Sequence, residues 1–203
     1  MDQNISAIPN PQSEIRNPQL GAAAALRAFL FWTYSDSIFG RLTVRVTGHQ
    51  LPDKSDAWSH MGIAFRLADF SIVYYENLFR TGFQGPKPFQ KLTDFRKAGG
   101  RLAIRMVDML PAECEEKRQR CEHWVGNRRG YFHLQLIGMW KFERLLRFYH
   151  APLPPSPNRG VCSEDAARIV YPRCDLRDSE REFDEINPNS AWRQYLKLFP
   201  DTI

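Results

Sequence analysis

The 203-residue sequence has no apolar run long enough to span a bilayer, no closely spaced pair of cysteines and no leader segment. Its longest apolar stretch, residues 21–34, contains Arg27 and falls short of the roughly 20 residues that a membrane-spanning helix needs. The four cysteines lack the CxxC spacing of structural zinc sites, and the polar start lacks a basic and apolar signal sequence. We therefore expect free thiols in a cytoplasmic protein without a transmembrane segment or a bound metal.

Blocks of a single charge are also missing, although the formal net charge is +5. Basic and acidic residues alternate in three regions, which are residues 96–105, 117–129 and 141–147. Because alternating charges are typical of solvated helix faces, this pattern argues against a nucleic-acid-binding surface. It leaves open a basic surface that attracts an anionic substrate or an acidic partner.

What is present predicts one α+β domain with a short arm in front of it. Residues 1–20 are polar, contain prolines and show no apolar period, so we expect a flexible arm there and a single domain over residues 21–203. Apolar spacing predicts helices over residues 21–34, 111–125 and 134–148, and a further helix that begins after Cys162 and ends before Pro172. Period-two patterns predict strands over residues 41–47 and 102–107, around His60 and around Glu76. We expect a long loop or lid over residues 78–100, a stiff connector over residues 152–157, and a tail that folds back onto the core through Trp192, Tyr195, Leu198 and Phe199.

Three residues in these elements have the properties of a nucleophile, its base and an orienting acid. Cys162 comes just before a helical segment, and both a helix amino terminus and a nearby imidazolium stabilise a thiolate. In a hairpin centred on Ala68, His60 would face Glu76 across the two strands, so that their side chains lie on one side of the sheet. We therefore predict Cys162 as nucleophile, His60 as general base and Glu76 as the residue that orients the imidazole.

The start of the Cys162 helix also offers an oxyanion site. The backbone N–H groups of Cys162 and Ser163 have no partner within the helix, and we expect them to bind the oxyanion of a tetrahedral intermediate. Gly62 and Ala64 share the predicted face of His60, and their small size suits the close approach of either a substrate or a helix.

The order of these motifs resembles the circularly permuted papain-like cysteine hydrolases of the YiiX and YaeF type, which are related in plan to NlpC-type proteins. In that group an SHVGI-type strand precedes an acid-bearing strand, and a late CSE-type motif supplies the nucleophile. This chain has Ser59-His60-Met61-Gly62-Ile63 and Cys162-Ser163-Glu164, and the likeness covers roughly residues 40–183. The resemblance implies a papain-like antiparallel sheet or half-barrel packed against helices, acyl transfer through a thioester, and no cofactor.

Cys121 is an alternative nucleophile. The segment Arg120-Cys121-Glu122-His123-Trp124 is similar to the NCEHF-type motif of lecithin retinol acyltransferase-like proteins, which share the permuted papain plan. However, Arg120 replaces the asparagine of that motif, and the segment falls inside a charged helix that begins near Pro111. We therefore favour Cys162.

These features predict a cysteine-dependent hydrolase, of the amidase, peptidase or esterase type, that acts on a small peptide-like, cell-wall or lipid-type substrate. The alternative is a non-catalytic binding module of the same fold, with an idle triad and a basic surface that holds an acidic partner. A third candidate is a lipid-facing acyltransferase, which would use the aromatic residues between Phe29 and Tyr34 beside a basic surface.

Overall fold

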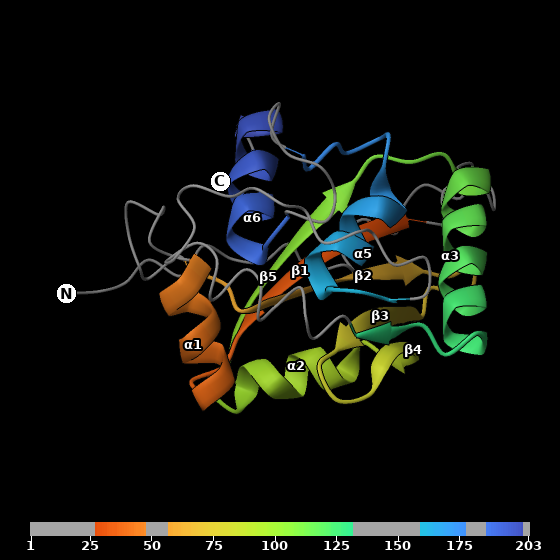
Figure 1. Ribbon diagram of the computed structural model, residues 1–203. Helices are drawn as coiled ribbons and strands as arrows, with labels where there is room; N and C mark the ends of the chain where they lie inside the picture. Colours follow the sequence, from red (N-terminus) through yellow and green to blue (C-terminus); the bar gives the residue numbers. More distant parts are fainter. Residues whose placement is uncertain (1–26, 48–56, 132–158, 178–185, 201–203) are drawn as a thin grey trace.

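The structure, a computed structural model, describes residues 27–47, 57–131, 159–177 and 186–200 (Figure 1). Its strands are β1 (Arg27–Tyr34), β2 (His60–Arg66), β3 (Ile72–Leu78), β4 (Gly82–Pro88), β5 (Arg101–Val107), β6 (Gly130–Tyr131) and β7 (Arg159–Gly160). Its helices are α1 (Ile38–Thr47), α2 (Gln90–Lys97), α3 (Pro111–Gly126), α5 (Cys162–Val170) and α6 (Pro188–Leu198). Five strands form one antiparallel sheet in the order β4-β3-β2-β1-β5, and β6 pairs with β7 in parallel. The fold is therefore α+β, as the sequence predicts.

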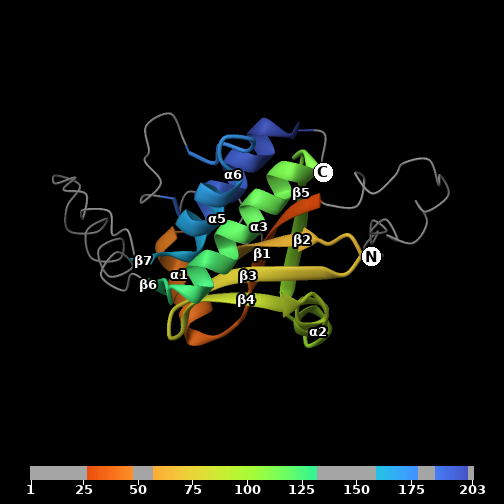
Figure 2. The same cartoon turned by 90° about the vertical axis from the view of Figure 1, so that its right-hand side faces the viewer.

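The sheet has a hydrophobic core on each of its two faces, because side chains alternate along every strand. Helices α3, α5 and α6 pack on one face, while α2 lies on the opposite side (Figure 2). The larger core includes Leu30, Trp32, Met61, Ile63, Phe65, Ile169, Trp192 and Tyr195. The smaller core contains Phe31, Ala64, Tyr74 and Leu92. His60 and Glu76 follow the alternation of Ala64 and Tyr74, so they belong to the α2 side of the sheet.

Strand β1 corrects the helix predicted over residues 21–34. Residues 27–34 are extended between β2 and β5, and residues 21–26 lie outside the described part of the chain. A central strand is buried on both faces, so its continuous apolar run looks like that of a buried helix. Phe31 and Trp32 are fully buried in the two cores, which removes the premise of a lipid-facing aromatic segment.

Helix α1 corrects the strand predicted over residues 41–47. The side chain of Ser37 accepts a hydrogen bond from the Gly40 N–H at 3.0 Å, in the manner of a helix N-cap. The Arg41 N–H then donates to the Ser37 carbonyl at 2.9 Å, which closes the first turn. Ser37 therefore starts a helix across residues that were predicted to form a strand.

Residues 78–100 form β4 and α2 rather than the predicted long loop. β4 is an edge strand, a position where prolines such as Pro86 and Pro88 are tolerated because their missing N–H faces away from the sheet. Two glycines and two prolines of this segment, Gly82, Gly85, Pro86 and Pro88, therefore belong to a sheet edge.

Two further predicted elements and the return of the tail onto the core are confirmed. Strand β5 and helix α3 occupy the predicted positions, and α6 folds back onto the larger core with Trp192 and Tyr195 buried, whereas Leu198 stays exposed. The predicted arm, the helix over residues 134–148 and the connector over residues 152–157 lie outside the described residues. None of the helices in the described ranges is long and apolar enough to cross a membrane.

Candidate active site

Helix α5 begins at Cys162, one residue earlier than the sequence predicts. The Val161 carbonyl accepts from the Asp165 N–H at 3.0 Å, and the Glu164 carboxylate reaches back to the Val161 N–H at 3.4 Å. The N–H groups of Cys162 and Ser163 therefore occupy the first turn, where a helix leaves its donors unpaired. The Ser163 hydroxyl is buried and donates to the Ile186 carbonyl at 2.5 Å, which leaves the backbone N–H as the group available for chemistry.

His60 and Glu76 lie on adjacent strands, but the register differs from the prediction by two residues. Glu76 is opposite Gly62, because the turn centres on Asp69 instead of Ala68. The Asp69 carboxylate accepts from the Ser71 N–H at 3.0 Å and from its hydroxyl at 2.6 Å, which stabilises the longer turn. A shift of two residues keeps every side chain on its face, so Glu76 reaches His60 diagonally.

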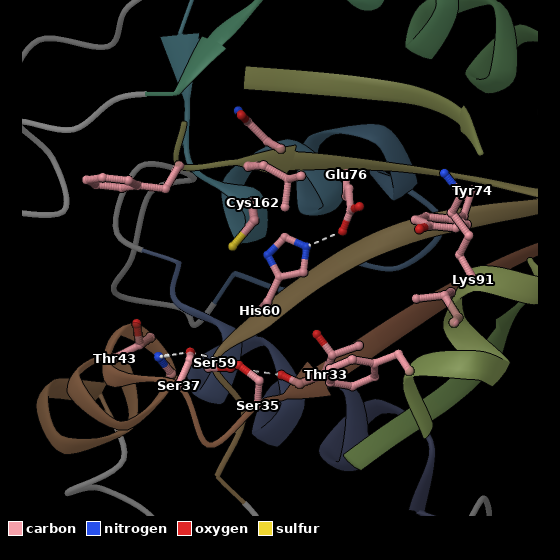
Figure 3. A pocket seen from close by; sticks show the side chains of 16 residues that line it. Thr33, Ser35, Ser37, Thr43, Ser59, His60, Tyr74, Glu76, Lys91 and Cys162 are labelled. Atoms are coloured by element: carbon pink, nitrogen blue, oxygen red, sulfur yellow. Dashed lines mark hydrogen bonds and ion pairs between the residues drawn. The ribbon is translucent and has the colours of Figure 1, made fainter. Parts of the chain in front are cut away.

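The three predicted side chains meet in one place. His60 Nε2 donates to Glu76 Oε2 at 2.8 Å. Figure 3 shows the Cys162 sulfur beside the other nitrogen of the ring, Nδ1, on the side away from Glu76. The imidazole therefore lies between the thiol and the carboxylate. Cys162 is 6% exposed and lines the cavity described below.

The charges of the site stabilise a protonated imidazole. Burial lowers the pKa of His60, but the charge and hydrogen bond of Cys162, together with those of Glu76, raise it to about 10. Burial raises the pKa of Glu76, whereas hydrogen bonds and charge interactions with His60 and Lys87 lower it to about 2. An ionised Glu76 beside the ring therefore stabilises the imidazolium form of His60 at neutral pH.

Lys87 is a fourth member of the site that the sequence did not reveal. Its Nζ donates to Glu76 Oε1 at 2.8 Å, so the two oxygens of Glu76 bind two different cations. Lys87 lies on β4, in the segment that was predicted to be a loop, and no local motif distinguishes it from other lysines. Its role becomes visible only once β4 pairs with β3.

A buried polar network holds the start of α5 against the sheet. Asp165 accepts from Arg129 at 2.7 and 2.9 Å and from Asn77 Nδ2 at 2.6 Å. Asn77 Nδ2 also donates to the Gly160 carbonyl at 2.8 Å, two residues before Cys162. A side chain at Gly160 would collide with Asp165 and Arg129. Because Asn77 follows Glu76 on β3, this network fixes the thiol relative to the acid-bearing strand.

A cavity of about 440 Å³ opens beside the Cys162 sulfur and the His60 ring. Its lining comes from the end of β1, the start of β2, α1, α2 and β3, and from Cys162 at the start of α5. Gly62 is not part of the lining, since the ring of Phe31 fills the space where its side chain would lie. Its small size therefore accommodates the Phe31 ring and the Tyr75 carbonyl within the sheet.

The alternative nucleophile, Cys121, lies elsewhere. It is fully buried in the larger core, inside α3, and is not among the residues that line the cavity. Burial raises the pKa of its thiol well above the ordinary value, which disfavours a thiolate. Within the described ranges, no group of three or more His, Cys, Asp or Glu side chains is arranged to hold a metal ion.

No family model, no curated protein and no solved structure matches this chain. The chemistry of the site therefore has to be argued from its own geometry.

Proposed function

We propose that the protein is a cysteine-dependent hydrolase that cleaves an amide, peptide or ester bond through a thioester intermediate. The observation that carries this proposal is the contact of Cys162, His60 and Glu76 at the wall of one cavity. A thiol at a helix amino terminus, a base against it and an acid behind the base are the three parts that nucleophilic catalysis requires.

In the acylation step, the Cys162 thiolate attacks the carbonyl carbon of the substrate, and the carbonyl oxygen becomes an oxyanion. The N–H groups of Cys162 and Ser163 donate hydrogen bonds to that oxyanion. As the tetrahedral intermediate collapses, the imidazolium of His60 gives its proton to the leaving nitrogen or oxygen, and the bond to the leaving group breaks. The product is a thioester on Cys162 and a neutral His60.

In the deacylation step, neutral His60 takes a proton from a water molecule, whose oxygen attacks the thioester carbonyl. The second tetrahedral intermediate expels the Cys162 thiolate and releases a carboxylic acid, and the imidazolium is restored. Glu76 keeps the ring in place in both steps and stabilises its charged form.

We also propose that the fold is a circularly permuted papain-like one. Its support is the order of the elements along the chain, in which a histidine strand precedes an acid strand and a late helix carries the cysteine at its first residue. Residues 84–100 and the residues before Gly40 have no counterpart in the resemblance, so substrate specificity is not inferred from it.

The proposal is tested by incubating the protein with p-nitrophenyl acetate. We expect a burst of p-nitrophenolate, followed by a steady release as the thioester hydrolyses. Mass spectrometry of proteolytic peptides should find the transient acetyl group on Cys162. The burst should disappear in Cys162→Ala and slow strongly in His60→Ala.

An acetyl group on Cys121 instead of Cys162 would reverse the assignment of the nucleophile. A correctly folded protein without any acetyl-cysteine would contradict the hydrolase and favour the binding module, in which the triad is idle.

A further inference from the structure

The cavity beside Cys162 is lined by side chains of different chemistry. Hydroxyl side chains belong to Thr33, Ser35, Ser37, Thr43 and Ser59. Apolar side chains from β3, the turn after it and α2 belong to Leu78, Phe79, Leu92 and Phe95. In Figure 3 the hydroxyl residues gather below His60, and Lys91 extends from α2 beside Tyr74, to the right of Glu76. A ligand in this cavity therefore meets polar and apolar surfaces at once.

The charges of the triad and of Lys87 balance one another. Glu76 pairs with both His60 and Lys87, and the proton shared between His60 and Cys162 adds no net charge whichever of the two holds it. The remaining charged side chain of the lining is Lys91, and no ion pair joins it to a carboxylate among the described residues. The cavity thus has an excess of one positive charge, and Lys91 carries it.

Resting on the function proposed above, we infer that Lys91 selects a substrate that carries a carboxylate. The substrate class is a small peptide-like amide or ester whose scissile carbonyl lies at Cys162 and whose free carboxylate pairs with Lys91. One ammonium group matches one negative charge, and the hydroxyls elsewhere in the lining add hydrogen bonds to the polar part of the same molecule. The apolar side chains of α2 in the lining, Leu92 and Phe95, pack against the carbon chain between the two groups.

A pair of alkylating probes that differ only in charge tests this inference. N-iodoacetyl-β-alanine carries a carboxylate at its far end, and its carboxamide has the same reach without the charge. The rates at which the two probes label Cys162 are measured at low ionic strength by peptide mass spectrometry. The ratio of the carboxylate rate to the carboxamide rate is then divided by the same ratio measured with free glutathione, which corrects for the intrinsic reactivity of the probes. Because only a ratio is used, the test works at any absolute reactivity of the thiol.

We expect the carboxylate probe to be favoured about fivefold, the upper range for a solvent-exposed ion pair. Lys91→Met should abolish the preference, Lys91→Glu should reverse it, and Lys91→Arg should retain it. Lys97→Met is the matched control, because Lys97 is an exposed lysine on the same helix that does not line the cavity, and the preference should be unchanged there.

Equal ratios in the native protein and in Lys91→Met would overturn the role of Lys91. This failure is distinguishable from a failure of the proposed hydrolase. A Cys162 that forms an acetyl-enzyme but shows no charge preference contradicts only the substrate class, whereas a missing acetyl-enzyme contradicts the hydrolase itself.

Discussion

At the scale of single residues, Glu76 connects the two cations of the site. One of its oxygens accepts from His60 and the other from Lys87, both at 2.8 Å. The carboxylate therefore cannot turn toward one partner without leaving the other. Lys87 is in this sense a positioning residue, because it acts on the imidazole only through Glu76.

Replacing Lys87 with methionine should slow the alkylation of Cys162 by iodoacetamide at neutral pH, because Glu76 loses one of its two anchors. We expect a reduction of about fivefold, in keeping with the loss of one charge-assisted hydrogen bond, and recovery of most of the rate in Lys87→Arg. Lys97→Met should leave the rate unchanged. A Lys87→Met protein with native kinetics would remove Lys87 from the site.

The low pKa of Glu76 has a consequence for stability in acid. Its pKa is about 2 in the folded protein and 4.5 ordinarily, so the unfolded chain takes up this proton first as the pH falls. The stabilisation is complete above pH 4.5 and is lost as the pH falls toward 2. A shift of this size corresponds to about 3 kcal/mol of unfolding free energy.

Urea denaturation of the native protein and Glu76→Gln, repeated at several pH values, measures this contribution. The difference between the two proteins should shrink as the pH falls through this window, whereas the exposed carboxylate variant Glu116→Gln should follow the native protein. A difference that stays constant with pH would contradict the ionised Glu76.

At the scale of elements, the buried network around Asp165 fixes the start of α5. Asp165 is 1% exposed and Arg129 is 6% exposed, so neither charge is solvated if the other is removed. Breaking a buried ion pair on one side typically costs about 3–5 kcal/mol. The cost is high because the remaining charge is left without a partner in an apolar environment.

We therefore expect Asp165→Ala to lower the free energy of unfolding by about 3–5 kcal/mol and Asp165→Asn to lower it by less. Chemical denaturation measures both, with Asp94→Ala on the exposed side of α2 as control. An Asp165→Ala protein as stable as the control would show that the pair does not hold α5.

The sequence allowed the elements of the triad to be predicted better than their surroundings. β2 and β3 flank a short turn, and α5 begins after a stretch of prolines and a glycine, so local signals identify them. β1 was predicted to be a helix, and α1 was predicted to be a strand. β1 is buried on both faces, so its sequence lacks the alternation of apolar and polar residues that identifies a strand. α1 depends on Ser37 as its N-cap, and a polar cluster such as residues 35–37 is also typical of a helix end.

At the scale of the whole molecule, a cluster of tryptophans joins the first described strand to the last helix. The rings of Trp32 and Trp192 are 5.1 Å apart, and those of Trp58 and Trp192 are 5.4 Å apart. Trp32 Nε1 donates to the Pro188 carbonyl at 3.1 Å, and the Asn189 side chain accepts from the Trp58 N–H at 2.6 Å. These contacts attach α6 to the sheet on the side of the larger core.

Trp192→Ala should therefore lower the free energy of unfolding by about 3–5 kcal/mol, as is typical for the loss of a large aromatic side chain from a core. Leu198→Ala, at a position that is 43% exposed on the same helix, should change it by much less. Equal effects of the two substitutions would show that α6 does not contribute to the core. The measurement is urea denaturation followed by tryptophan fluorescence and circular dichroism.

The order of the strands in the sheet could not be predicted from the sequence. β1 pairs with β2 and also with β5, which is about seventy residues away along the chain, and no local pattern specifies such a partner. Lys87 and the lining of the cavity depend on this order, so they could not be predicted before the fold was known. The packing of the tail against the core could be predicted from the sequence, because aromatic residues at helical spacing require burial.

The most direct test of the account is the pH dependence of Cys162 alkylation by iodoacetamide, followed on its own peptide by mass spectrometry. Because the pKa of His60 is raised to about 10, the imidazolium persists across neutral and mildly alkaline pH. The account predicts that Cys162 in the folded protein reacts faster near pH 6 than it does in the urea-unfolded chain, with a rate that is nearly constant up to about pH 9. In His60→Ala the rate should instead rise with pH, as for a free thiol with a pKa of about 8.5. A folded-state rate at pH 6 no higher than that of the unfolded chain, unaffected by His60→Ala, would contradict the thiolate–imidazolium pair and the hydrolase built on it.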